Sequence, residues 1–337
     1  MIKRSPSITK ETADRVWEKI RALNYTPNVL ARSLRLARSR TVGLMVTNVD
    51  NPFYSKIILG AEEVLRSEGY GIFLCNNLWD SRIEADYVRM LLENRAAGII
   101  ITPAEGETDH LKAVVDSGTP VVFIDRKVEG IDTDYVINDI VLAGRIATEH
   151  LIRLGHRRIG HISGAKEYEH IIAFQDIIAG YRQAHEESEL AVDADLIKFG
   201  GLDIESGQKV MRAFLEMNEP PTAVFCVNDL AALGAMAAIY EAGLKVPEDV
   251  AIVGIDDIEV SALPYIGLTT VSQPEYEIGR IAAQIILERI SGRYQKGSTR
   301  LRRERIVLKP KLMIRNSCGA RPLGKGGEKP SHSVDFG

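Results

Sequence analysis

Apolar runs of strand length alternate with amphipathic helical segments from residue 41 onward, and this alternation constrains the fold more than any other feature. The first set of strands is predicted at 42–46, 71–75, 98–102 and 120–124. The helices between them are predicted at 55–67, 82–94 and 108–117. Because these strands are apolar along their whole length, they are typical of a parallel sheet covered on both faces.

The same alternation starts again after a predicted helix at 141–154. Strands are expected at 158–163, 196–199, 222–227 and 250–255, and helices at 171–187, 205–217 and 229–242. Two such runs predict an α/β protein with two doubly wound parallel-sheet subdomains and a cleft between them. Residues 271–274 are expected to cross back, followed by a helix at 276–291 and one closing strand near 305–314.

These patterns divide the chain into three parts. Residues 1–40 form a small α-helical head, with helices predicted at 9–23 and 28–38. Residues 41–317 form the core, in which the N-subdomain takes 41–140 and 274–299 and the C-subdomain takes 141–273 and 300–317. The tail at 318–337 is rich in Gly, Pro, Ser and Lys, so we expect it to be disordered.

Charge is distributed unevenly along the chain. Residues 1–41 hold ten basic and three acidic residues, a net charge of +7, and since the whole chain carries −4 the remainder carries −11. A basic head on an acidic body suggests that the head meets a polyanion such as DNA. A solvated basic arm is the alternative interpretation.

Motifs of enzymes and of exported proteins are missing from the sequence. It contains no GxGxxG turn after a strand, no GxxxxGK[ST] loop, no GxSxG elbow and no HExxH spacing, so we expect no catalysis, no cofactor and no metal. His156 and His161 flank a strand start, where a structural role is expected. No apolar run approaches the roughly 18 residues of a spanning helix, and because no apolar run follows the charged start we expect no secretory signal there. Three scattered cysteines fit a reducing cytoplasm.

Polar and aromatic residues gather where the predicted strands end. Ligands of open parallel sheets bind beyond the carboxyl ends of the strands, where amides and carboxylates can bind hydroxyls while aromatic rings stack on an apolar face. Asp125-Arg126 and Asn138-Asp139 occupy such ends. Asp50 and Asp229 are expected to cap helices or turns instead. The residues favoured as ligand-binding are Asn51, Phe53, Tyr54, Asn228 and Asp256.

Ordered motifs along nearly the whole chain, from residue 8 to about residue 317, resemble the LacI family of bacterial transcriptional regulators. They are LNYTPNVLARSL (23–34), TVGLMV (41–46), NPFY (51–54), GIIITP (98–103), PVVFIDR (120–126), LGHRRIGHISG (154–164), AGYRQA (179–184), PTAVFCVNDLAALGAM (221–236), VPEDVAIVGIDD (246–257) and LTTVSQP (268–274). The resemblance implies a cytoplasmic homodimer that binds a palindromic DNA operator, as a repressor, under control of a sugar or nucleoside. It also implies a core like that of periplasmic sugar-binding proteins.

The resemblance assigns roles to individual residues of the core. It places Phe53 and Tyr54 where family members stack on the effector and Phe225 on the opposite wall, while Asn228 and Asp256 fall where effector hydroxyls or ring nitrogens are bound.

Two further positions of the core bear on the effector. Asn138 or Asp139 falls where a family Asp or Asn sits. Ile177 stands where the family has an effector-clamping Arg, so the effector is predicted to be less polar or of another class.

The resemblance also interprets the head. Residues 9–23 match the third helix of the family's DNA-binding head and 27–36 match its hinge helix. The first and recognition helices would precede Met1, so either the start codon was assigned too far downstream or the chain is a truncated paralogue. Leu34 is expected to wedge into the minor groove and the arginines to bind phosphates. The predicted DNA-binding residues are Asn28, Ala31, Arg32, Leu34, Arg35 and Arg38. The alternative function is an effector-binding core without operator recognition.

Overall fold

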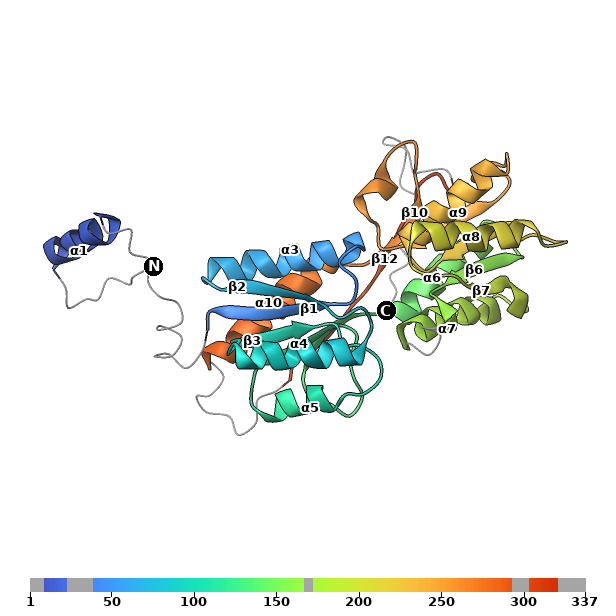
Figure 1. The fold of residues 1–337 in the computed structure, drawn as a ribbon. Helices are drawn as coiled ribbons and strands as arrows, with labels where there is room; N and C mark the ends of the chain where they lie inside the picture. Colours follow the sequence, from blue (N-terminus) through green and yellow to red (C-terminus); the bar gives the residue numbers. More distant parts are fainter. Residues whose placement is uncertain (1–8, 23–38, 167–171, 293–302, 321–337) are drawn as a thin grey trace, which may run out of the picture.

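Two α/β lobes make up most of the protein (Figure 1). The computed structural model describes residues 9–22, 39–166, 172–292 and 303–320 of the 337. Helix α1 (Lys10–Ala22) lies where the first helix was predicted, whereas the predicted hinge helix at 28–38 lies outside the described residues. Within the described ranges, no helix is long and apolar enough to cross a membrane.

The N-lobe is built on a six-stranded parallel sheet. Strand order reverses at β1, which lies between β2 and β3, so the sheet has the topological switch at which ligands of doubly wound folds bind. In order across the sheet, the strands are β11 (Arg305–Leu308), β5 (Asp134–Asn138), β4 (Val121–Asp125), β3 (Gly98–Ile101), β1 (Thr41–Val46) and β2 (Gly71–Asn76).

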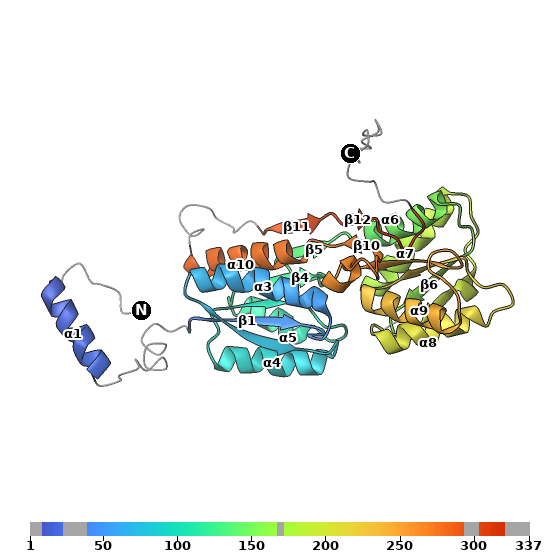
Figure 2. The ribbon, with the colours of Figure 1, turned by 90° about the horizontal axis from the view of Figure 1, so that it is seen from above.

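Four helices cover the two faces of this sheet. Helices α3 (Pro52–Ser67) and α10 (Glu275–Ser291) pack on one face, and α4 (Ser81–Glu93) and α5 (Asp109–Asp116) on the other (Figure 2). Helices α3 and α10 approach so closely that a Cβ atom on Gly279 would lie 1.9 Å from the carbonyl oxygen of Ile57. Only glycine fits there, and the close contact fixes the end of α3 that points toward the other lobe.

The C-lobe repeats the plan. Its sheet has the order β12 (Lys311–Met313), β10 (Thr269–Ser272), β9 (Ala251–Ile255), β8 (Ala223–Cys226), β6 (Ile159–Ser163) and β7 (Ile197–Phe199). Only β12 runs antiparallel, against β10. Helices α6 (Ile140–Arg153) and α7 (Ile172–Glu187) pair with one another, as do α8 (Ile204–Leu215) and α9 (Asp229–Glu241). Short 3₁₀ turns, η2 (Ala194–Leu196) and η3 (Glu259–Ala262), complete the lobe. The predicted fold class is confirmed.

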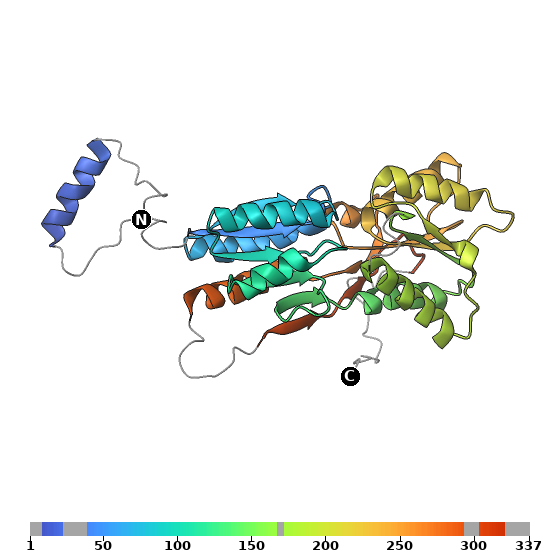
Figure 3. The ribbon, with the colours of Figure 1, turned by 60° about the horizontal axis from the view of Figure 1, so that its bottom comes forward.

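Among the described residues, the chain crosses between the lobes three times, after β5, after β10 and after β11 (Figure 3). The single closing strand predicted near 305–314 is wrong: β11 and β12 belong to different sheets, separated by Pro310, which has no N–H to donate. The assignment of 300–317 wholly to the C-subdomain is therefore also wrong, because β11 is an edge strand of the N-lobe.

Two other boundaries differ from the sequence-based expectation. Strand β5 was not predicted because its first residue is acidic, but Asp134 is neutralised by two hydrogen bonds from Arg289, at 2.7 and 2.9 Å. The predicted disordered tail does not begin at Cys318, whose side chain is 1% exposed. Residues 321–337 lie outside the described ranges.

Candidate functional site

A cavity of about 180 Å³ lies between the lobes, where the carboxyl ends of strands from both sheets meet. Aromatic and aliphatic side chains form much of its wall, including Phe53, Trp79, Phe174 and Ile177. Polar groups converge on it from both lobes. Six of the eight predicted effector-binding residues line it, namely Asn51, Phe53, Tyr54, Asn138, Asn228 and Asp256.

The carboxylate of Asp256 connects the two lobes inside this cavity. Its Oδ2 accepts a hydrogen bond from the Asn51 amide at 3.3 Å, and its Oδ1 accepts one from Gln273 at 2.9 Å. Burial raises the pKa of Asp256 well above its ordinary value, and the nearby charges of Asp229 and Glu275 raise it further. The charged form therefore needs donors, and a ligand that donates hydrogen bonds to Asp256 would stabilise it.

Two predicted asparagines combine helix capping with a place in the wall. Asn51 caps α3 by accepting the Phe53 N–H at 3.0 Å, and Pro52 at the first helical position explains why α3 begins earlier than predicted. Asn228 caps α9 by accepting the Ala231 N–H at 2.8 Å and donates to the Leu202 carbonyl at 2.9 Å. Beyond these bonds and the one from Asn51 to Asp256, each side chain has one amide hydrogen and one oxygen lone pair left for a ligand.

A second polar cluster follows β4. Thr47 donates to the Tyr54 hydroxyl at 2.5 Å, and that hydroxyl donates to Asp125 at 3.2 Å. Burial raises the pKa of Asp125, while the adjacent positive charge of Arg126 opposes the rise. Asp125 has a φ of 67°, a backbone conformation that is unfavourable for a residue with a side chain and is typically retained at functional sites.

Arg126 is the main residue that the sequence prediction missed, although the Asp125-Arg126 pair at a strand end was the signal for it. Its Nη1 donates to Glu105 at 2.8 Å, and its Cζ lies 5.0 Å from the centroid of the Trp79 ring. Among the described residues, its Nε and Nη2 have no hydrogen-bond partner, although both are buried. Ile177 contributes an aliphatic surface to the wall. The cavity thus has a guanidinium despite the Ile at 177, and it comes from the other lobe.

Asn138 and Asp139 have different surroundings despite being neighbours. Asn138 donates to Gln273 at 2.6 Å, and its Oδ1 accepts nothing within the described part of the chain. Asp139 does not line the cavity, and its carboxylate caps α6 by accepting the Leu142 N–H at 3.0 Å. The site prediction for Asp139 is corrected accordingly, because the first turn of α6 takes its oxygen.

Phe225 also lies away from the cavity. Its side chain is fully buried in the C-lobe core and stacks on His161 with 4.8 Å between ring centroids. Strand β8 ends one residue later, so Val227 and Asn228, beyond its end, reach the cavity wall instead. The expected stacking role of Phe225 is corrected to a role in the core. His161 has the expected structural role, with its Nδ1 3.1 Å from the Phe225 carbonyl oxygen.

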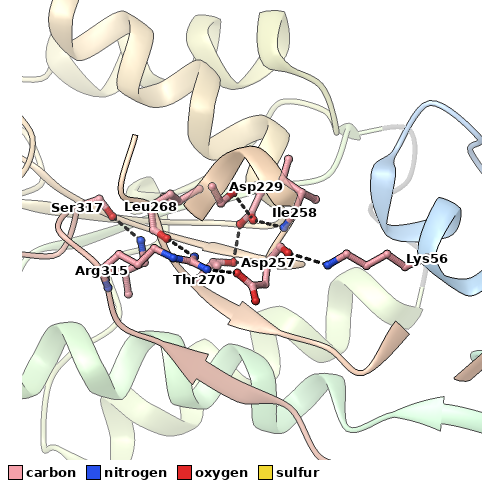
Figure 4. A network of polar contacts seen from close by, with 10 residues as sticks. Lys56, Asp229, Asp257, Ile258, Leu268, Thr270, Arg315 and Ser317 are labelled. Carbon is pink, nitrogen blue, oxygen red and sulfur yellow. Dashed lines mark hydrogen bonds and ion pairs between the residues drawn. The ribbon is translucent and has the colours of Figure 1, made fainter. Parts of the chain in front are cut away.

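A network of buried polar groups holds the loop that carries Asp256 (Figure 4). Asp229 does not cap α9; its carboxylate accepts from the Ile258 N–H at 3.0 Å and from two hydroxyls, those of Ser261 and Thr270. Burial raises the pKa of Asp229 to about 7. These bonds fix the loop to the buried side of the C-lobe.

Asp257 fixes the same loop from the outer side. Its carboxylate pairs with Arg315 at 2.5 Å, and its carbonyl oxygen accepts a hydrogen bond at 2.9 Å from Lys56 on α3 (Figure 4). Lys56 therefore reaches from one lobe to the other next to the Asn51–Asp256 contact.

Comparisons with known proteins agree with this architecture. A family profile described as "Periplasmic binding proteins and sugar binding domain of LacI family" matches residues 39–313. The repressor PurR of Aliivibrio salmonicida (strain LFI1238) is 35% identical over 298 residues, 88% of each chain, and PurR of Haemophilus influenzae (strain PittEE) is 35% identical over 318 residues, 94% of this chain and 93% of that protein. This chain belongs to the LacI family.

Solved structures show the same relationship for this LacI-family protein. A complex of the transcriptional regulator CelR with cellobiose has a TM-score of 0.73 and 29% identity, covering 93% of this chain and 92% of that one. A LacI-family regulator from Enterococcus faecium with bound ribose has a TM-score of 0.70 and 28% identity, covering 82% and 98%. The protein is a DNA-binding transcriptional repressor controlled by a small molecule, and not an enzyme.

The buried His161 makes a testable contribution to stability. Burial lowers its pKa to about 4, whereas unfolded histidine titrates near 6.5. As the pH falls below about 6.5, the unfolded chain binds a proton that the folded chain does not, so stability is lost until about pH 4. We expect wild type to lose about 2 to 3 kcal/mol more than His161→Phe between pH 7 and 4.5, measured by urea unfolding.

Burial also lowers the pKa values of His150 and His185. Both proteins contain these two residues, so their contribution drops out of the difference between the two losses of stability. Equal losses of stability in wild type and variant would show that His161 is not kept neutral in the folded state.

Proposed function

We propose that this LacI-family repressor binds its operator as a homodimer in the cytoplasm, and that a single-ring polyhydroxylated compound, a sugar or the sugar of a nucleoside, is its effector. The observation that carries the proposal is the convergence of Asp256 from one lobe with Asn51 and Arg126 from the other on one cavity. A ligand that satisfies both sides favours the arrangement in which the lobes are close, and so can change the operator affinity.

The chemistry of the wall favours hydroxyl groups. The carboxylates of Asp125 and Asp256 accept hydrogen bonds, while the unsatisfied Nε and Nη2 of Arg126 donate them. A hydroxyl both donates and accepts, so neighbouring hydroxyls on one ring suit this mixture. The rings of Phe53 and Phe174 offer apolar surface for the face of a sugar or a base.

A single ring with neighbouring hydroxyls is the simplest ligand that offers donors and acceptors together. We therefore choose D-ribose as the first probe, beside hexoses and nucleosides. Arg126 supplies the cationic donor that position 177 lacks, so the effector we propose is more polar than the one first expected from Ile177.

Asp256→Asn tests this proposal. The amide keeps the size of the carboxylate but replaces a charged acceptor by a weaker one, so the variant should lose nearly all of the rise in melting temperature that the bound probe gives. Each variant's own melting temperature without ligand is the baseline, because the amide removes a buried carboxylate but leaves a single acceptor oxygen for Asn51 and Gln273. Differential scanning fluorimetry with the panel of D-ribose, hexoses and nucleosides measures both.

Asp50→Asn is the matched control, because it makes the same change at an exposed residue of the neighbouring loop. It should keep the full ligand-induced shift. If Asp256→Asn also keeps that shift, the effector does not bind at this carboxylate.

Operator binding is proposed to reside in the head. The predicted DNA-binding residues between 28 and 38 lie outside the described residues, so the minor-groove role of Leu34 stays a prediction. A homodimer would place two heads on the two halves of a palindrome.

The dimer proposal is supported by apolar side chains exposed on the N-lobe. Leu59 on α3 is 60% exposed, and Phe73 and Leu74 on the edge strand β2 are 41% and 45% exposed. Side chains of this kind are typical of subunit interfaces. Sedimentation at micromolar concentration should give the mass of two chains, and Leu59→Lys should shift the equilibrium toward single chains. A wild-type protein that sediments as a single chain contradicts the dimer.

A further inference from the structure

Two loops of the N-lobe contact the C-lobe at one edge of the cavity. We call them the lip, comprising residues 77–80 after β2 and residues 102–105 after β3. From the first loop, the Trp79 ring lies 5.6 Å from the Phe174 ring on α7. From the second, the Glu105 carboxylate accepts the Ile172 N–H at the start of α7, at 3.2 Å. Through these two contacts the lip connects the N-lobe to α7.

Arg126 joins the two loops of the lip to the cavity. Its guanidinium lies over the Trp79 ring and pairs with Glu105, while its remaining donors are buried at the cavity wall. An effector oxygen bound by Arg126 would thus be connected to both contacts with α7. Binding of such an oxygen would therefore depend on where the lip lies.

The conformation of the first loop is not one that its residues favour. Leu78 and Trp79 have φ values of 52° and 63°, in the left-handed region that glycine or asparagine usually occupies. Such a turn persists only where its surroundings hold it. Asn77 does so directly, because its side-chain oxygen accepts the Trp79 N–H at 3.2 Å.

One buried carboxylate fixes both loops. Glu84, in the first turn of α4, is fully buried, and its Oε2 accepts from the Asn77 amide at 2.8 Å and from the Ala104 N–H at 2.5 Å. Its Oε1 lies 2.8 Å from His110 Nε2 on α5. Glu84 therefore holds both Asn77, which fixes the turn at Trp79, and Ala104, which directly precedes Glu105.

We propose that Glu84 is a positioning residue for the effector site: through Asn77 and Ala104 it places Trp79 and Glu105 so that the lip grips α7 around a bound effector. Glu84 itself does not line the cavity. Its role in effector affinity rests on the proposed function, whereas its role in placing the lip does not.

The placement can be tested without any ligand. The chain has two tryptophans, so in a Trp17→Phe background Trp79 is the sole tryptophan and its fluorescence reports on the lip. Glu84→Gln keeps the shape but offers a single acceptor oxygen, and should raise the acrylamide quenching constant of Trp79 about two-fold, because the turn loosens. Glu93→Gln, an exposed change on the same helix, should leave it unchanged.

These measurements are made well below the melting temperature, where loss of stability alone does not expose Trp79. If Glu84→Gln were to unfold, Asn77→Ala in the same background removes the side chain that links the turn to Glu84 and to the Thr102 carbonyl, and should raise quenching in the same way. Unchanged quenching in the folded variants overturns the proposal.

A second measurement concerns affinity and separates the two proposals. With D-ribose as the probe, Glu84→Gln should raise the Kd about ten-fold, as expected for the loss of about one hydrogen bond. In a Trp79→Ala background, Glu84→Gln should raise the Kd much less, because the ring that Glu84 positions is gone. Equal effects in both backgrounds contradict action through Trp79. If neither D-ribose nor any of the hexoses and nucleosides binds wild type, the proposed effector class fails, while the quenching result still decides the role of Glu84.

Discussion

The hydrogen bond that Asp256 accepts from Asn51 joins one lobe to the other inside the cavity, next to the one that it accepts from Gln273. A carboxylate buried there is costly unless donors surround it, and each lobe alone supplies too few. The relative position of the lobes and the charge on Asp256 therefore depend on one another. An effector that offers further donors would change this balance at the point where both lobes meet, and the three described segments that cross between the lobes connect its two sides.

The same dependence explains why the backbone around the cavity is unfavourable and yet retained. Asp125, Asp256 and Asp257 all have positive φ values, each at the end of a strand. Strain of this kind is of the order of 1–3 kcal/mol per residue. The contacts of Asp257 with Arg315 and Lys56 offset part of it, and they lie directly beside the strained loop. Contacts outside the cavity thus keep the loop at its wall in this conformation.

The sequence predicts the fold well because it repeats one pattern. Continuous apolar strands and amphipathic helices identify a doubly wound lobe twice, and these signals are local. The predictions that failed depend on distant partners. Strand β5 begins with Asp134, which is tolerated because its carboxylate accepts hydrogen bonds from Arg289 on α10 and from the Glu304 N–H. The division of 305–313 between two sheets is a matter of pairing that no local pattern expresses.

The site divides in the same way. Strand ends predict polar residues such as Asn51 and Asp256, and these lie at the cavity. Whether an Asx side chain faces the cavity or caps its helix is settled by rotation of the side chain, which is why Asp139 was misassigned. Trp79 and Phe174 were missed because they meet across the cleft from loops and helices whose contact is wholly tertiary.

Hydrogen exchange followed by mass spectrometry tests the central claim most directly, that one effector binds both lobes at once. The compound that raises the melting temperature, with D-ribose tried first, should slow amide exchange together in N-lobe segments around residues 51–54 and 125–127 and in C-lobe segments around 172–177 and 255–258. Protection confined to one lobe, with the other unchanged at saturating ligand, would contradict the account.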